Sequence, residues 1–331
     1  MQKILSISVA AYNMEKLIRQ NLDSFVHSAV AKDVEVLVID DGSKDSTAEI
    51  VREYEQKYPD TVRLIQQENA GPGSTVNRGM EHATGKYFRM VDADDWVGEG
   101  FDLFVQTLKT IDVDMVLSDY MMVDDKTSEQ RLCRVQGIPA GQVLNFEDVC
   151  ASLSLAMHCT TFRTELLQTN NIRLFNGFYT DMQYLMFPTP YVKTIYYADC
   201  TVYMYRVSLS GQSMSAASMQ RNWKMHDDML FSLIKLYQDY VSGSSFSQNV
   251  SEYIAARTAS LAGTEMGTLL SFEPNEESKK RLYDFLKRLQ EGPSAIYRRF
   301  ARLKTTRVLL FGHGIFYRPL SVLHRKRLGI Q

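Results

Sequence analysis

Three carboxylates stand close together in the segment KYFRMVDADDWV, residues 86–97: Asp92, Asp94 and Asp95. The residues just before them, Tyr87 to Val91, have the aromatic and apolar character of a β-strand. Placing this much negative charge at one strand end costs repulsion energy unless a positive charge neutralises it. The segment therefore indicates either a solvated acidic turn that leads into a helix or a divalent metal site at a sheet edge.

The elements that must position these carboxylates follow from the patterning of residues 1–92. The apolar run VEVLVIDD, typical of a strand buried on both faces of a parallel sheet, ends in a second acidic pair, Asp40 and Asp41. Strand and helix patterns alternate regularly, which predicts a parallel sheet with right-handed crossovers. The predicted strands are 4–12, 34–41, 62–67 and 86–92, and the predicted helices are 14–31, 43–58 and 74–83.

The carboxyl ends of parallel strands meet at one edge of a sheet, where open α/β folds bind their ligands. We therefore expect the acids at 40 and 41 to line the same crevice as those at 92, 94 and 95. Two independent acidic strand ends are hard to explain as solvated turns.

A glycine-rich turn lies between the two acidic strand ends, at Gly71, Pro72, Gly73 and Ser74. Its backbone N–H groups could face an anion, because the turn leads into a helix. The spacing GxxxxGK[ST] of a phosphate loop is absent, and no GxGxxG follows the first strand, which argues against a dinucleotide cofactor. The turn is either an anion contact or simply the entry of a helix.

The rest of the chain carries weaker patterns, without an internal repeat or a long linker. Asp181 falls at a predicted loop-to-helix junction within GFYTDMQYLMFP, and the chain beyond the last predicted strand is mostly helical in pattern. The other segments predict a helix and a strand at 100–119, a polar surface excursion at 120–145, a largely helical stretch at 146–171 and an aromatic strand pair at 194–206.

The composition is that of an ordinary folded protein, with 45% hydrophobic and 23% charged residues among 331. The formal net charge is −2, but residues 292–331 contain nine Lys or Arg and no acid, so the remainder carries −11. No stretch is apolar enough to span a membrane. The apolar run near the N-terminus is at the lower length limit for a signal peptide and alternates with serine as a strand would, so we expect a cytoplasmic protein. The cysteines have no metal-type spacing and are expected to be reduced: Cys133, Cys150, Cys159 and Cys200.

Taken together, these motifs resemble the family 2 inverting glycosyltransferases with the GT-A fold, in particular short bacterial enzymes that build surface glycans. The matching motifs stand in the family's order: SVAAYN at 8–13, VIDDGSKDST at 38–47, NAGPG and NRG within 69–79, VDADDW at 91–96, FYTDMQY at 178–184 and YRVSLSGQSMS at 205–215.

The resemblance implies the fold class α/β: a GT-A Rossmann-like, mostly parallel sheet flanked by helices, with a helical C-terminal region. Together with the patterning it predicts a nucleotide-sugar-binding α/β half at 1–119. An acceptor-binding and catalytic-base half of the same domain follows at 120–215. The helical C-terminal region, with its basic amphipathic tail, takes up 216–331.

The resemblance also assigns roles to the acidic segment at residues 86–97. Asp92 and Asp94 match the DxD motif of the family, and Ala93 between them belongs to the nucleotide-sugar site. Asp94 would coordinate Mn²⁺ or Mg²⁺ on the donor diphosphate, while Asp92 contacts the ribose side. The cation would offset the charge that builds on the leaving group. Asp95 is either a partner behind this site or the cap of the following helix.

Further contacts to the nucleotide sugar are implied at several strand ends and loops. Asp41 matches the aspartate that accepts a hydrogen bond from uracil, and Tyr12 the aromatic residue beside the base. Val76 stands where many relatives have arginine, so Arg78 is the candidate for the phosphate, although at helical spacing it could equally point to solvent. Arg206 either reaches the diphosphate or pairs with a surface acid. The complete implied set is Ala10, Tyr12, Asp41, Asn69, Gly71, Arg78, Asp92, Ala93 and Arg206.

Asp181 matches the family's catalytic base. Inversion is a single displacement, so one base must take the proton from the acceptor hydroxyl as it attacks. The alternative is that Asp181 only caps a helix. Thr180 stands where the family usually has Glu, and it joins His158 as a candidate for binding the acceptor.

The predicted function is metal-dependent, inverting transfer of a sugar from a UDP-sugar to a hydroxyl of a glycan or lipid-linked glycan, in bacterial cell-surface polysaccharide or glycoprotein glycan synthesis. A sugar-phosphate nucleotidyltransferase would need a basic, glycine-rich loop after the first strand, and AAYNMEK is not one. A non-catalytic nucleotide-sugar-binding or scaffold subunit is the alternative from another class. No motif encodes the sugar or the acceptor.

The basic tail, residues 294–328, interleaves Arg and Lys with apolar residues. We expect the tail to form two short helices at most, because it is interrupted by Gly312, Gly314 and Pro319. Such a segment suits an anionic membrane surface, which would make the protein peripheral at the inner face of the plasma membrane. Alternatively, its apolar residues pack on the body of the protein or on a second subunit. We expect no nucleic-acid partner, because the remainder of the chain is acidic.

Overall fold

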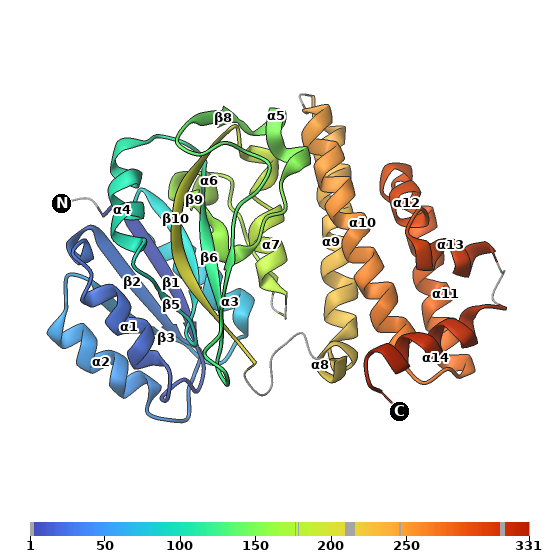
Figure 1. Cartoon of the computed structure of the whole chain (residues 1–331), viewed down its shortest axis with the longest axis horizontal. Helices are drawn as coiled ribbons and strands as arrows, with labels where there is room; N and C mark the ends of the chain where they lie inside the picture. Colours follow the sequence, from blue (N-terminus) through green and yellow to red (C-terminus); the bar gives the residue numbers. More distant parts are fainter. Residues whose placement is uncertain are drawn as a thin grey trace. The chain divides into compact units, whose positions relative to one another are not determined.

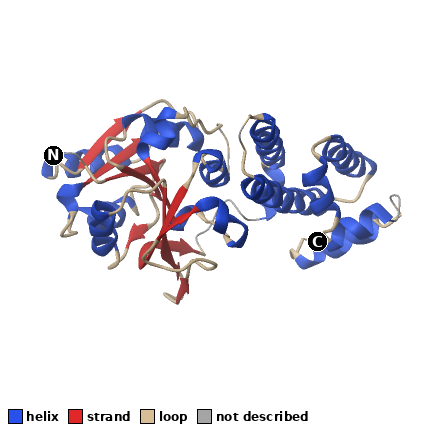
Figure 2. Ribbon diagram, turned by 90° about the horizontal axis from the view of Figure 1, so that it is seen from above, coloured by secondary structure: helices blue, strands red, loops and turns tan. Residues whose placement is uncertain are grey.

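The chain divides into two units, and every strand that the structure describes lies in the first of them (Figures 1 and 2). The computed structural model describes residues 3–175, 177, 179–208, 216–244, 246–311 and 315–330. The first unit is Met1–Leu209 and the second is Ser210–Gln331. Each unit has its own core and is described by itself.

One mixed, ten-stranded sheet forms the centre of the first unit. Its strands are β1 (Leu5–Ala11), β2 (Val34–Asp40), β3 (Val62–Gln66), β4 (Tyr87–Asp92), β5 (Trp96–Val97), β6 (Met115–Asp124), β7 (Gln130–Cys133), β8 (Val143–Asn145), β9 (Thr160–Arg163) and β10 (Thr194–Val207). They lie in the order β3-β2-β1-β4-β9-β6-β10-β5, with β7 beside β6 and β8 beside β10. The helices of the unit are α1 (Ile18–Val26), α2 (Thr47–Lys57), α3 (Pro72–His82), α4 (Phe101–Thr110), α5 (Phe146–Val149), α6 (Thr164–Thr169) and α7 (Thr180–Met186).

The four strands β3, β2, β1 and β4 are parallel to their neighbours, as the alternating pattern predicts. Burial on both faces explains the continuous apolar run of β2, because Val36 to Ile39 have no exposed surface. Helix α3 approaches β1 so closely that a Cβ on Gly79 would lie 2.0 Å from Ser8 Oγ. Glycine at this position therefore lets the third crossover helix pack on the sheet.

The prediction of a largely helical stretch at 146–171 is confirmed only in part. The segment contains the two short helices α5 and α6, two 3₁₀ turns and strand β9, which pairs antiparallel with both β4 and β6. Hydrogen bonding to two neighbouring strands outweighs the helical pattern here, and Thr160, Thr161 and Phe162 suit a fully buried strand.

The predicted strand pair at 194–206 is instead the single strand β10, which runs parallel to β6 over most of its length. Its register shifts between Ala198 and Thr201 and again between Thr201 and Tyr203. These irregularities absorb Asp199 and Cys200 without a chain reversal, because a bulge can accommodate extra residues within one strand.

Helices alone make up the described part of the second unit: α8 (Ala216–Arg221), α9 (Trp223–Ser242), α10 (Gln248–Ser271), α11 (Glu276–Glu291), α12 (Ser294–Ala301), α13 (Lys304–Phe311) and α14 (Tyr317–Arg327). Side-chain caps begin two of them, since Ser247 accepts from Val250 N and Asn275 from Ser278 N. No helix among the described residues has the length and apolar character of a membrane span.

The prediction of at most two short helices in the basic tail is also wrong, because the structure has three, α12 to α14. Pro319 lies in the first turn of α14, where a backbone N–H has no partner within the helix, so it does not end the helix. Gly312 and Gly314 lie outside the described residues.

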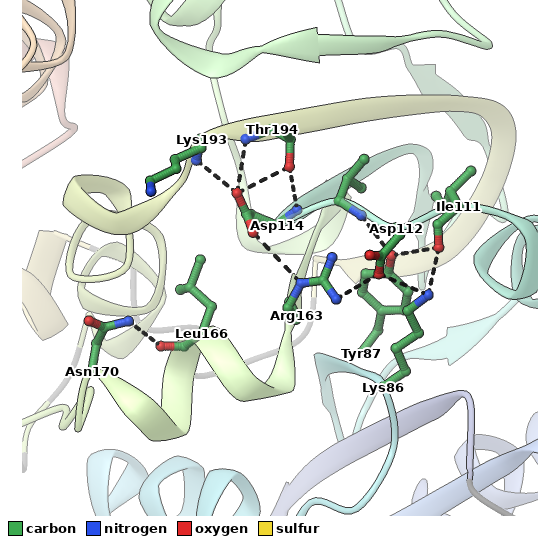
Figure 3. A network of polar contacts seen from close by, with 11 residues as sticks. Lys86, Tyr87, Ile111, Asp112, Asp114, Arg163, Leu166, Asn170, Lys193 and Thr194 are labelled. Carbon is green, nitrogen blue, oxygen red and sulfur yellow. Dashed lines mark hydrogen bonds and ion pairs between the residues drawn. The ribbon is translucent and has the colours of Figure 1, made fainter.

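A polar network joins the starts and ends of four strands in the first unit (Figure 3). Arg163 at the end of β9 contacts Asp112 Oδ1 at 2.7 Å and Asp114 Oδ1 at 3.6 Å. Asp114 Oδ2 accepts from Lys193 N and Thr194 N, both at 2.9 Å, and from Thr194 Oγ1 at 3.1 Å. The Asp114 carboxylate thus fixes the point at which β10 begins.

We expect Asp114→Ala to lower the free energy of unfolding by about 2 kcal/mol, because three donors lose their acceptor at a site where the side chain is 20% exposed. The matched change Asp112→Ala removes a neighbouring carboxylate that is 74% exposed, and we expect a loss below about 1 kcal/mol. Urea unfolding followed by circular dichroism measures both. Equal losses would contradict the role given to Asp114.

Candidate active site

The strand directions bring the predicted site residues to one edge of the sheet. Ala10 on β1 lies in register with Asp92 on β4, and Ala11 lies in register with Asp40 on β2. Strand β9 is antiparallel to both β4 and β6, and β6 is parallel to β10, so these last two strands run in the same direction as β4. The residues gathered at this carboxyl edge are Tyr12, Asp41, Asp92, Ala93, Asp94 and Arg206.

Asp41 holds the glycine-rich turn against the end of β2. Its Oδ1 accepts from Gln67 Nε2 at 2.7 Å and Ala70 N at 2.9 Å, and its Oδ2 accepts from Gly71 N at 2.9 Å. Gly71 has a φ of 87°, a left-handed conformation that favours glycine, and Pro72 then begins α3. The turn therefore has one defined path, with Asn69 exposed on it.

Asp95 does not cap the following helix, and that alternative of the sequence analysis is wrong. Its buried carboxylate accepts from Tyr203 Oη at 2.6 Å and from Arg206 N at 2.7 Å, both on β10. Helix α4 begins only at Phe101. The acid instead ties the end of β4 to β10, directly behind Asp92 and Asp94.

Arg206 on β10 contacts the acidic turn formed by residues 92–95. Its Nε donates to the backbone oxygen of Asp94 at 2.8 Å, and its terminal nitrogens donate to Asp125 Oδ1 and Gln20 Oε1, both at 2.6 Å. The guanidinium also lies 4.8 Å from the centre of the Trp96 ring. Arg206 thus pairs with an acid, as one alternative expected, and at the same time fixes the backbone of the DxD motif.

The electrostatics of the edge show an excess of negative charge. Burial and the charges of Asp94 and Asp181 raise the pKa of Asp92. Burial raises the pKa of Asp94, against a smaller lowering by Arg206, and burial together with Asp92 and Asp94 raises the pKa of Asp95. A divalent cation would relieve this repulsion, and carboxylate oxygens are suitable ligands for it, so the donor set fits Mn²⁺ or Mg²⁺.

Asp181 is exposed in the first turn of α7, close enough for its charge to act on Asp92. The N-cap of this helix is Tyr179, so the alternative that Asp181 is the capping residue is wrong. Tyr179 adopts a φ of 70°, a left-handed conformation unusual for a tyrosine. The turn that presents Thr180 and Asp181 is thus built on a strained residue, a feature often found at functional sites.

His158 lies under the acidic edge within a cluster of tyrosines. Its ring centre is 4.1 Å from that of Tyr205, 4.9 Å from Tyr203 and 5.2 Å from Tyr120. One nitrogen of His158 and one oxygen each of Asp92 and Asp95 lie within 4.8 Å of one another. Burial and the nearby Arg89 lower the pKa of His158 to about 4, which keeps the imidazole neutral near pH 7.

Residues 6–170 match the protein family described as Glycosyl transferase family 2. This chain belongs to glycosyltransferase family 2. Among curated family members, the poly(ribitol-phosphate) beta-glucosyltransferase of Bacillus spizizenii is 38% identical over 96 residues, which cover 28% of this chain and 15% of the relative. Matches to three further relatives span 33%, 14% and 40% of their lengths, so the chain covers well under two thirds of the curated relatives it matches.

Similarity to solved structures shows that this chain has the GT-A fold expected from its sequence. The crystal structure of S. aureus TarS 1–349 in complex with UDP-GlcNAc has a TM-score of 0.68 at 19% identity, over 98% of this chain and 90% of that one. The mannosyltransferase PcManGT from Pyrobaculum calidifontis, in complex with GDP-Man and Mn²⁺, has a TM-score of 0.53 at 15% identity, over 98% and 87%.

The sequence patterns did not single out Arg89 on β4, a buried cation next to His158. Its guanidinium is fully buried and donates to Ser118 Oγ at 3.1 Å, to Thr161 Oγ1 at 3.0 Å and to the backbone oxygen of His158. The visible signal was an arginine in the middle of the strand pattern KYFRMVD. The predicted phosphate contact Arg78 is half-exposed on α3, and its guanidinium lies 3.9 Å from the carboxylate of Glu81.

Tyr203→Phe tests the tie between β4 and β10. We expect the free energy of unfolding to fall by about 1–3 kcal/mol, because the buried Asp95 carboxylate loses one of its two donors from β10. Tyr196→Phe on the same strand is the matched control, and we expect a change within about 0.5 kcal/mol. If both variants unfold at the same urea concentration, the Asp95 contact carries no stabilisation.

Proposed function

We propose that this chain is a metal-dependent, inverting glycosyltransferase that moves a sugar from a UDP-sugar to a hydroxyl of a bacterial cell-surface glycan or cell-wall polymer. The observation that carries the proposal is the convergence of Asp92, Asp94 and Asp181 at the carboxyl edge, where burial and the charges of Asp94 and Asp181 raise the pKa of Asp92. A base and a metal-type acid pair within electrostatic reach of each other are what a single-displacement transfer requires.

The donor would bind to the half of the first unit formed by residues 1–119. Asp41 fixes the turn at 67–71, and Tyr12 and Asn69 are exposed at the same edge, in a position to contact a nucleotide base and its ribose. The complex of TarS with UDP-GlcNAc supports a UDP-sugar as the donor.

Asp94 and Asp92 would hold Mn²⁺ or Mg²⁺, and the Mn²⁺ in the PcManGT complex supports this assignment. When bound, such a cation offsets the negative charge that develops on a departing diphosphate. The chain itself orients the two acids, since Arg206 holds the Asp94 backbone and Asp95 holds the end of β4 against β10. The group of Asp92, Asp95 and His158 is a second place for the cation.

The acceptor would bind to the half formed by residues 120–215, where Asp181 takes the proton from its attacking hydroxyl. Because Asp181 is exposed, an acceptor can reach it directly. The poly(ribitol-phosphate) beta-glucosyltransferase among the relatives supports a cell-wall polymer as the acceptor class.

Asp94→Ala should abolish Mn²⁺-dependent binding of UDP, measured by calorimetry with and without the metal. The substitution removes the carboxylate to which we assign the cation, while both oxygens of Asp95 keep their β10 donors. His158→Gln should retain metal-dependent binding within a few-fold. The reverse pattern would move the cation to the group of Asp92, Asp95 and His158.

Asp181→Asn should bind UDP-sugar and Mn²⁺ as the unmodified chain does but transfer sugar about 10²–10⁴-fold more slowly, because the general base is lost. A screen of UDP-sugars with Mn²⁺, scored by release of UDP, identifies the donor for this comparison. Undiminished transfer would show that the base lies elsewhere. Binding of a UDP-sugar without any turnover in the unmodified chain would favour a non-catalytic binding subunit.

A further inference from the structure

The last three helices of the second unit, α12 to α14, carry apolar residues on two different faces. One set is buried in the core of the unit: Ile296, Phe300, Leu309 and Tyr317. The other set is turned away from that core, and Phe311 is 84% exposed and Ile315 78% exposed. The tail is therefore an integral part of the helical unit that also presents an apolar outer surface.

The outer surface contains a groove of about 720 Å³. Its lining is mostly apolar, with two cationic side chains, and consists of Ala301, Lys304, Arg307, Val308, Leu310, Phe311 and Phe316. Val322 and Leu323 on α14 add further exposed apolar side chains to the unit. We call the surface made by Lys304, Arg307, Val308, Phe311 and Ile315 the α13 surface.

The two cations that belong to this surface, Lys304 and Arg307, pair with no carboxylate among the described residues. Residues 292–331 include nine Lys or Arg and no acid. Arg299 pairs with Glu252, but Lys304, Arg307, Arg318 and Lys326 take part in none of the ion pairs found among the described residues. An exposed surface with unneutralised cations beside large apolar side chains matches a partner that is both anionic and apolar.

We propose that the α13 surface docks the protein on an anionic lipid bilayer. Phe311 and Ile315 would enter the boundary between headgroups and acyl chains, while Lys304 and Arg307 face the lipid phosphates. This mode needs no membrane-spanning helix. It goes beyond the transfer reaction, since it concerns where the enzyme works and which acceptors it can reach.

Charge and apolar exposure argue against the two other occupants. In a symmetric dimer the same patch meets its own copy, so Lys304 and Arg307 would face like charges across the interface. A nucleic acid could pair its phosphates with the two cations, but it would leave Phe311 and Ile315 exposed to water. A bilayer surface satisfies the cations and the apolar side chains together.

Point substitutions test the proposal better than removal of the tail, because Ile296 and Phe300 belong to the core of the unit. The full chain is sedimented with vesicles of phosphatidylcholine alone and of an equimolar mixture with phosphatidylglycerol, at low and at high salt. We expect binding to the anionic vesicles at low salt and little binding to phosphatidylcholine alone.

Two double variants separate the contributions of charge and apolar contact. Lys304→Gln with Arg307→Gln should weaken binding to the anionic vesicles about 30-fold, the equivalent of about 1 kcal/mol for each cation. Phe311→Ser with Ile315→Ser should weaken it about 10-fold or more, since both side chains are largely exposed and contribute only when they enter the lipid.

The matched control is Lys224→Gln with Lys235→Gln on α9, which removes the same charge from cations that are paired with Asp228 and Asp239. This control should bind vesicles as the unmodified chain does. UDP binding should be unchanged in all three double variants, which separates this test from that of the transfer reaction.

Three results would overturn the proposal. The full chain could fail to sediment with anionic vesicles at low salt. The control variant could lose as much binding as the α13 variants, which would reduce the effect to net charge. Finally, Phe311→Ser with Ile315→Ser could convert an oligomer into a monomer without any change in lipid binding, which would identify a second copy as the occupant.

Discussion

The buried carboxylate of Asp95 is the contact on which the geometry of the acidic edge depends. Both of its oxygens accept from β10, one from the Tyr203 hydroxyl and one from the Arg206 backbone. Without this tie, repulsion among the neighbouring acids would favour separation of the end of β4 from the rest of the sheet. With it, Arg206 is held where its side chain bonds the Asp94 backbone, and the two outer acids are directed toward the same edge. The buried Asp95 thus positions Asp92 and Asp94 for a ligand.

The sequence predicts the parallel half of the sheet because its signals are local. Each strand there is a short apolar run, and the acids that follow β2 and β4 indicate the ligand edge directly. The half of the sheet that contains the antiparallel strand β9 is harder to predict from the sequence. This segment forms a strand because it pairs with both β4 and β6, and that position depends on the fold rather than on the local sequence. The residues around Asp199 and Cys200 resemble a turn in the sequence, which therefore predicts two strands. In the structure they form an irregularity in the pairing of the single strand β10. The contacts of Tyr203 with Asp95 join residues more than a hundred positions apart, and no local pattern encodes them.

Buried charge alone does not mark a functional site in this protein. Arg89 is a fully buried cation, yet two hydroxyls and a backbone oxygen accept from it, and the rings of Phe104 and Tyr203 lie 5.4 Å and 5.9 Å from its guanidinium carbon. These partners are neutral groups within the chain, and the Nε of Arg89 has no hydrogen-bond partner among the described residues. Burial and the positive charge of Arg89 together lower the pKa of His158, which keeps that ring neutral beside the acidic edge.

The acidic edge and the α13 surface differ from Arg89 because each carries charge that the described residues do not balance. At the acidic edge, burial and the charge of Asp94 raise the pKa of Asp92, and burial with the charges of Asp92 and Asp94 raises the pKa of Asp95. The guanidinium of Arg206 is directed to Asp125 and to a backbone oxygen. On the α13 surface the imbalance has the opposite sign, and exposed apolar side chains accompany it. A buried excess of carboxylates calls for a small, hard cation, whereas an exposed mixture of cations and apolar side chains calls for an extended anionic and apolar surface. The sign of the unbalanced charge and its depth together select the class of ligand at each place.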